Sequence, residues 1–250
     1  MPENTIQSVF NILSEIKGLC LVDDVYNGAF SWYLTHMFLF TLLLFPIAFF
    51  YYVLPRRKEL RPRFLISLFA FAAAGVICAF RGFFMFRSVY DGSAFLYFYL
   101  ENAFTCVLFP LLVYLFFLIL SRDSWRDKIS SFALFMLPFY AVYLPAEIFA
   151  NAVPLPFFFL FIKPLLYLLM VIAVAGESKT LFNVISGRGK ELCISLLIII
   201  AELFTPPLIE TLWHYAFPLP LWAVPAALYA VLCVFRTKLV FKLRAELMQR

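Results

Sequence analysis

Seven ionisable side chains lie within, or at the edge of, long apolar stretches of this sequence. They are His36, Arg81, Glu101, Glu147, Lys163, Glu202 and Glu210. A charged side chain at the centre of a bilayer costs about 2.5–3.5 kcal/mol on insertion scales, so such residues persist where they face protein or water, or have partners. We therefore expect these residues to build a site that binds a small molecule or an ion.

The central predicted interaction of this site joins Lys163 and Glu202. Counted from the predicted cytoplasmic ends of their helices, both residues lie about 18–20 Å from the cytoplasmic boundary at a rise of 1.5 Å per residue. They have opposite charges and lie on consecutive antiparallel segments, so we predict that they pair. Glu101 and Glu210 fall about 30 Å from that boundary by the same rise, where a position at the membrane interface explains them equally well.

Proline interrupts the apolar segments beside several of these charges. In "IAELFTPPLIETLW", residues 200–213, Pro206 and Pro207 follow Glu202 closely. Because proline has no backbone N–H, Pro206 leaves the carbonyl group of Glu202 without its helical donor. Interrupted helices with nearby charges build the substrate and ion sites of many transporters. An ion pair that only braces kinked helices is the alternative interpretation.

Polar side chains gather in one half of the apolar segments. Hydroxyl groups recur three or four positions from a charge, as in Tyr143 before Glu147 and Tyr167 after Lys163, which places them on one helix face. The predicted cytoplasmic halves, such as "VLFPLLVYLFFLIL", contain no charged or amide side chain. The sequence therefore predicts a polar vestibule that opens outward and is sealed by apolar packing below.

The composition decides which elements position these residues. The chain is 64% hydrophobic and 14% charged, and its mean hydropathy is +0.93. Soluble domains are about 45–50% apolar and about 25% charged. Continuous apolar runs of about 20 residues are typical of membrane-spanning helices rather than of a barrel. We therefore predict an all-α, multi-pass protein of an inner or plasma membrane.

Seven spans account for the apolar runs, and the basic residues predict their direction. The predicted spans are 29–54, 63–86, 94–120, 129–152, 155–176, 190–212 and 217–236. Sixteen of the twenty Lys and Arg residues lie in the loops and tail of one side. By the positive-inside rule that side is cytoplasmic, so the N-terminus lies outside and the C-terminus inside.

Two segments flank the predicted seven-helix bundle of residues 29–236. Residues 1–28 carry apolar side chains at helical spacing but are too polar to span, which predicts an amphipathic segment on the outer surface. Residues 237–250 form a basic cytoplasmic tail, which we expect to anchor the chain at the membrane surface or to contact a protein partner. The net charge of +5 is explained by orientation, so we expect no nucleic acid partner.

Several kinds of chemistry find no support in the residues. The chain has only two histidines, His36 and His214, so a zinc site with three histidine ligands is excluded, and we expect no metal and no cofactor. A site that uses both histidines with Glu210 is geometrically conceivable. No GxSxG motif and no complete phosphate-binding loop is present.

Three hypotheses for function follow from these patterns. The first is a carrier or binder of a small molecule or ion, with proton coupling through the buried acids. The second is a membrane receptor, a sensor or a subunit of a larger membrane complex. The third, which the residues favour least, is an intramembrane enzyme with Glu147, Glu202 and His36 as acid and base candidates.

Overall fold

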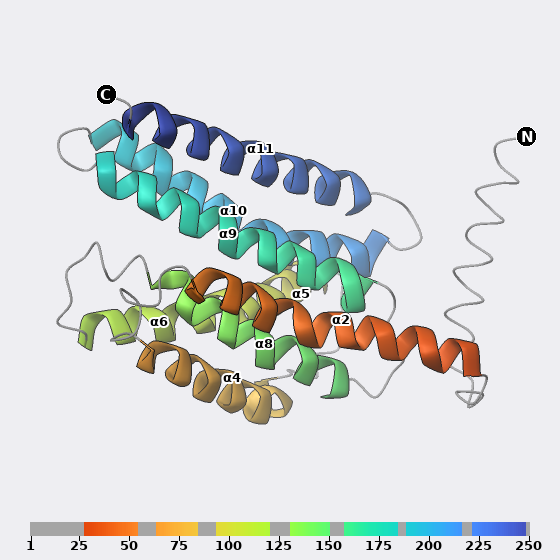
Figure 1. The fold of residues 1–250 in the computed structure, drawn as a ribbon. Helices are drawn as coiled ribbons and strands as arrows, with labels where there is room; N and C mark the ends of the chain where they lie inside the picture. The colour runs from red at the N-terminus through yellow and green to blue at the C-terminus, as the bar shows by residue number, and fades with distance from the viewer. Residues whose placement is uncertain are drawn as a thin grey trace, which may run out of the picture.

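A computed structural model of the chain describes residues 28–54, 64–84, 94–120, 131–150, 158–184, 189–216 and 222–248 (Figure 1). Within these ranges the backbone is helical and contains no strand. The helices are α2 (Gly28–Val53), α4 (Leu65–Phe84), α5 (Ala94–Ala103), η3 (Phe104–Leu108), α6 (Phe109–Leu120), α8 (Phe132–Ala150), η4 (Phe158–Ile162), α9 (Lys163–Val184), α10 (Gly189–Ala216) and α11 (Ala223–Met248). The predicted all-α fold is confirmed, because each predicted apolar segment contains a helix of this list.

Helices α8 and α9 form the centre of the bundle. α8 packs against α2, α4, α6 and α9, and α9 also packs against α10 and α11. In Figure 1, α9, α10 and α11 lie side by side as one layer, with α2, α4 and α8 on the other side of α9. Every side chain from Phe132 to Tyr140 in α8 is buried. α8 is therefore apolar around most of its circumference, as a helix enclosed by other helices must be.

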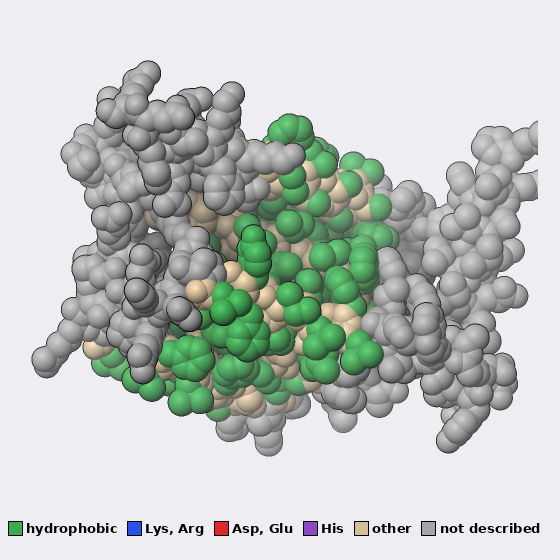
Figure 2. All heavy atoms as spheres, in the orientation of Figure 1, with side chains coloured by type: hydrophobic (Ala, Val, Ile, Leu, Met, Phe, Trp, Pro, Cys, Tyr) green, Lys and Arg blue, Asp and Glu red, His purple; other side chains and the backbone are tan. Residues whose placement is uncertain are grey.

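The outer helices expose large apolar side chains. Ile119 of α6 and Phe235 of α11 are 78% and 70% exposed, and Figure 2 shows one face on which the described side chains are almost all hydrophobic. Soluble monomers rarely expose apolar patches of this extent, so this surface is suited to lipid. Three helical stretches, Phe95–Leu120, Phe158–Ser178 and Cys193–Trp213, are long and apolar enough to cross a membrane.

Four further apolar helical stretches are shorter when only the residues with described side chains are counted. They are Leu39–Val53, Leu65–Cys78, Phe132–Glu147 and Ala223–Phe235. The structure thus supports a helical membrane protein by length and composition. The seven crossings and the side on which each terminus lies stay predictions.

At four prolines of the bundle, a side chain of another helix replaces the backbone hydrogen bond that the proline removes. In an α-helix the carbonyl group four residues before a proline loses its N–H donor. Four such carbonyl groups accept a hydroxyl donor: Cys106 before Pro110 from Tyr140 (2.6 Å), Leu134 before Pro138 from Ser67 (3.0 Å), Leu160 before Pro164 from Thr41 (2.6 Å) and Glu202 before Pro206 from Tyr229 (3.2 Å). These hydroxyl groups satisfy polar backbone atoms that a membrane interior would otherwise leave without a partner.

The two π-helical turns occupy the same place relative to a proline. η3 ends two residues before Pro110, and η4 ends two residues before Pro164. A proline ring clashes with the carbonyl group four residues earlier, and a wider turn relieves this contact. The wider turn also leaves the carbonyl group accessible to a hydroxyl group from a neighbouring helix. η4 leads directly into Lys163, so this irregular turn sets the position of that side chain.

Parts of the predicted flanking segments lie outside the described residues. The predicted outer-surface segment, residues 1–28, is described only at Gly28, where α2 begins. The predicted tail begins at residue 237, but α11 continues without a break to Met248. No proline or glycine interrupts this stretch after Pro225, so nothing in the sequence ends the helix at the predicted boundary. The role of the tail stays a prediction.

Candidate functional site: a buried acid–lysine cluster

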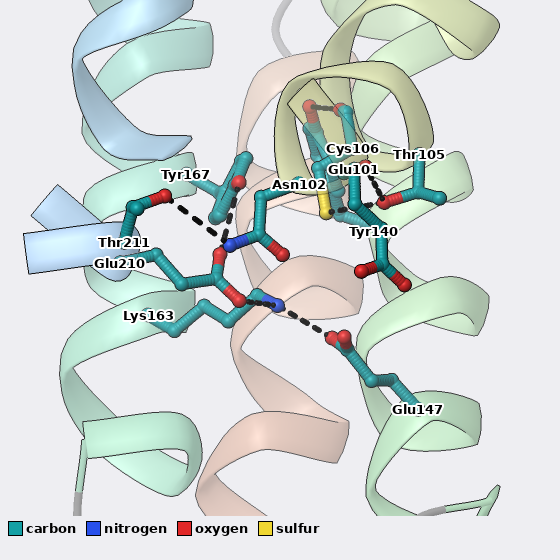
Figure 3. Close-up of polar contacts among 10 residues, drawn as sticks. All are labelled: Glu101, Asn102, Thr105, Cys106, Tyr140, Glu147, Lys163, Tyr167, Glu210 and Thr211. Atoms are coloured by element: carbon teal, nitrogen blue, oxygen red, sulfur yellow. Dashed lines mark hydrogen bonds and ion pairs between the residues drawn. The ribbon is translucent and has the colours of Figure 1, made fainter. Parts of the chain in front are cut away.

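Lys163, the first residue of α9, is the centre of a buried polar cluster (Figure 3). Its side chain is 1% exposed, and its Nζ donates hydrogen bonds to Glu147 Oε2 at 2.7 Å and to Glu210 Oε1 at 2.6 Å. Glu147 belongs to α8 and Glu210 to α10, so one ammonium group joins three helices. We call Glu147, Lys163 and Glu210 the triad.

Aromatic side chains complete the surroundings of the ammonium group. Lys163 Nζ lies 5.1 Å from the ring centroid of Phe159 and 5.9 Å from that of Tyr167. The Tyr167 hydroxyl also donates to Glu210 Oε2 at 3.4 Å. A cation within about 6 Å of an aromatic face is attracted by the ring quadrupole, and the attraction grows where water is excluded. The triad therefore combines charge-assisted hydrogen bonds with two aromatic contacts around a single cation.

Polar residues of α5 adjoin the triad on the side of α10. Figure 3 shows Glu101 and Asn102 next to Glu147 and Glu210. Asn102 Nδ2 donates to Thr211 Oγ1 at 3.5 Å. Thr211 in turn donates to the carbonyl group of Pro207 at 2.8 Å. A further acid and an amide thus extend the polar region from the triad to a fourth helix.

The predicted partner of Lys163 was wrong. We expected Glu202, whereas the structure pairs Lys163 with Glu210, two helical turns further along α10, and with Glu147 of α8. The prediction compared only the depths of the backbone at Lys163 and at Glu202, counted along each helix. Side chains on a helix tilt toward its N-terminus, and α9 and α10 are antiparallel, so Lys163 and Glu210 tilt toward each other and close the difference in level.

Glu202 is buried elsewhere on α10, at 7% exposure. The Glu202 carbonyl group, which Pro206 deprives of its helical donor, accepts a hydrogen bond from the Tyr229 hydroxyl of α11. This hydrogen bond between Tyr229 and the Glu202 carbonyl group therefore holds α11 against α10 in this conformation. Sequence position alone could not show this, because the donor comes from a helix that follows later in the chain.

The triad is enclosed by protein, whereas the sequence suggested an open vestibule. Four aromatic rings form a connected group next to Lys163: Phe158 contacts Trp213 at 4.9 Å and Trp222 at 5.4 Å between ring centroids, and Phe159 contacts Trp213 at 5.1 Å. Phe158 and Phe159 precede Lys163, and Trp213 follows Glu210 by three residues. These rings therefore lie between the triad and the nearby helix ends, where we expected aromatic side chains at the membrane interface.

The remaining predicted site residues are placed only in part. His36 lies in α2 and Arg81 in α4, but their side chains are outside the described residues, and so is the side chain of His214. Glu101 lies beside the triad, and Thr105 donates to its carbonyl group at 2.9 Å. Among the described residues no group of three or more His, Cys, Asp or Glu side chains is arranged to hold a metal ion.

Sequence reasoning did not find Thr41, Cys106 and Asn102. Thr41 holds the turn before Lys163, and the Cys106 thiol lies within electrostatic reach of the triad. The only available signal was the rule that a proline inside a helix needs a substitute donor. That rule identifies the acceptor but not the helix that supplies the hydroxyl group.

The arrangement permits proton transfer within the cluster. Two carboxylates and one amine are in direct contact, so a proton can pass between them or leave with the rearrangement of one side chain. Comparison of the chain with protein-family models, with curated protein sequences and with solved structures finds no match in any of the three.

Proposed function

We propose that this protein binds a small molecule or ion at the triad and moves it across the membrane in a step coupled to the movement of a proton. The observation that carries the proposal is the buried triad itself, in which one ammonium group is shared by carboxylates from two other helices. Buried ionic groups cost desolvation energy, and replacing them with apolar side chains is often stabilising. A chain that keeps three of them at one point therefore has a use for their charge.

Breaks in the helices beside the triad support movement at this point. Pro164 follows Lys163 directly, Pro145 precedes Glu147 by two residues, and Pro207 precedes Glu210 by three. Proline removes one backbone hydrogen bond and weakens the helix locally, which lets short helical segments tilt. Each member of the triad is thus carried on a segment that can change direction while the rest of the bundle stays packed.

The test is a comparison of thermal unfolding in detergent with defined probes: Na⁺, K⁺, methylammonium, acetate, inorganic phosphate and alanine. We expect at least one probe to raise the Tm of the wild type but not that of Glu210→Gln. Glu177→Gln is the matched control, because Glu177 is also a buried acid and lies on α9 fourteen residues after Lys163. Equal shifts in all three proteins, or none with any probe, would leave the triad as a structural brace only.

A further inference from the structure

The Lys163 ammonium group occupies the surroundings that proteins use to recognise a free cation. It touches two carboxylate oxygens at 2.7 and 2.6 Å and two aromatic rings at 5.1 and 5.9 Å from their centroids. Carboxylate oxygens and aromatic faces recognise ammonium groups, and carboxylate oxygens also bind metal cations. The lysine side chain therefore fills, from inside the protein, a site whose chemistry fits a small monovalent cation.

We propose that this site exchanges the Lys163 ammonium group for an external monovalent cation, and that one proton leaves for each cation that enters. The inference rests on the proposed function and names its ligand class. Lysine suits this role because its ammonium group can release a proton, whereas the guanidinium group of arginine stays charged in proteins. The ligand class is a small cation such as Na⁺ or methylammonium.

The exchange balances in atoms and in charge. One N–H bond of Lys163 breaks, its electron pair stays on nitrogen, and the proton leaves to water. The neutral amine then moves from between the two carboxylates, and the cation takes its place between Glu147 Oε2 and Glu210 Oε1. The site loses one positive charge and gains one, so the buried carboxylates have a positive partner both before and after the exchange, which avoids the cost of an uncompensated buried charge in either end state.

The position of Lys163 in the chain favours this movement. Its backbone lies between the π-helical turn η4 and Pro164, and Thr41 of α2 holds the Leu160 carbonyl group of that turn at 2.6 Å. At this point the Leu160 carbonyl group thus accepts a hydrogen bond from another helix. A small rotation of this turn carries the amine away from the carboxylates without unwinding α9.

Other titratable groups face the triad from the helices packed around it. Among the described residues these are Glu101 of α5, Cys106 of η3, Tyr140 of α8 and Tyr167 of α9. Glu202 lies elsewhere on α10, two helical turns before Glu210. Thiol and phenol groups ordinarily release a proton only above neutral pH, and Thr41, the contact from α2, does not titrate. Outside the triad, Glu101 is the group that can compete with Lys163 for the exchanging proton, so Glu101→Gln belongs in the test.

The test uses the full chain in phosphatidylethanolamine–phosphatidylglycerol vesicles that contain the pH dye pyranine. Addition of Na⁺ or methylammonium outside should make protons leave the lumen in wild-type, Glu177→Gln and Glu101→Gln vesicles. Lys163→Arg keeps the charge that the carboxylates contact, so it should fold with an unchanged Tm. Its cation-dependent proton signal should fall by at least about tenfold, because arginine does not release a proton in proteins.

A second variant separates the cation from the proton. Lys163→Gln cannot exchange a proton, so ²²Na⁺ or labelled methylammonium should still bind or enter, with no pyranine signal. If Lys163→Arg keeps the full signal, or if Glu101→Gln alone abolishes it, the assignment of the exchanging proton to Lys163 is overturned. If only acetate, phosphate or alanine acts on the wild type, the ligand class is wrong while the proposed function stands. If no probe acts at all, both fail.

Discussion

The two ends of the bundle differ in what fills the space between the helices. At the end where α9 begins, Lys163, Glu147 and Glu210 meet in a hydrogen-bonded cluster. Toward the other end, aromatic rings fill this space. The ring centroids of Tyr114 of α6 and Phe135 of α8 are 5.4 Å apart, and those of Phe135 and Phe139, both of α8, are 6.4 Å apart. Ion pairs therefore join the helices at the first end, and close packing of aromatic side chains joins them at the second.

This difference indicates how a ligand route must work. A charged cluster can exchange partners, because another cation can replace one already bound. An aromatic core has no such alternative, because its side chains are already packed against one another. A ligand that reaches the triad can therefore cross to the opposite end only if helices move. Four sets of variants test whether the two ends behave as separate units.

The largest effect is expected from removing the centre of the triad. Lys163→Met leaves two buried carboxylates without the ammonium group, so it should lower the free energy of unfolding by about 3–5 kcal/mol. The triple variant Lys163→Met, Glu147→Gln, Glu210→Gln should recover most of this loss, since no buried charge of the triad remains. Denaturant unfolding in detergent measures both. A single variant as stable as the wild type would contradict the buried ion pairs.

A comparable but purely structural effect is expected at the aromatic end. Phe135→Ala removes a fully buried ring and should cost about 3 kcal/mol, because such truncations leave a cavity that the surroundings only partly fill. Unlike the variants of the triad, it should leave the dependence of Tm on added cations unchanged. A loss of that dependence in Phe135→Ala would show that the two ends are not separable.

An intermediate effect is expected from the hydroxyl groups that replace proline donors. Tyr140→Phe leaves the buried carbonyl group of Cys106 without the hydroxyl donor that lies 2.6 Å away, and should cost about 1–3 kcal/mol. In a Pro110→Ala background the restored N–H can serve that carbonyl group, so Tyr140→Phe should cost less there. Thr205→Val is the control, because its hydroxyl donates to Ala201, a carbonyl group that no proline deprives of a donor. If Tyr140→Phe lowers the free energy of unfolding equally with and without Pro110→Ala, the Tyr140 hydroxyl does not replace the donor that Pro110 lacks.

The smallest effect is expected on the exposed apolar surface. Leu197→Ala, on a side chain that is 65% exposed on α10, should change the free energy of unfolding by less than about 0.5 kcal/mol. Leu166→Ala, on a buried side chain of α9, should cost several times more and gives the scale for comparison. The measurement is unfolding in lipid-containing micelles. Equal costs at the two positions would show that the exposed face of α10 is covered by protein rather than by lipid.

The sequence predicted which residues belong to the candidate site, but not which of them are in contact. Lys163, Glu147 and Glu210 were all expected in it, because ionisable groups in apolar segments need partners. Glu210 was explained equally well by a position at the membrane interface, and its contact with Lys163 was missed. A level counted along a straight helix carries no information on side-chain tilt, which decides contacts over distances of several ångströms.

The helical class, the approximate positions of the helices and the carbonyl groups that proline leaves without donors could all be inferred from the amino-acid sequence. These properties depend on residues close together in the chain, through apolar runs and the missing proline N–H. Only the tertiary structure decided that Thr41, Ser67, Tyr140 and Tyr229 supply the substitute donors, and that Lys163 meets Glu147 and Glu210. Those contacts join separate helices, so they depend on which helix faces packing brings together.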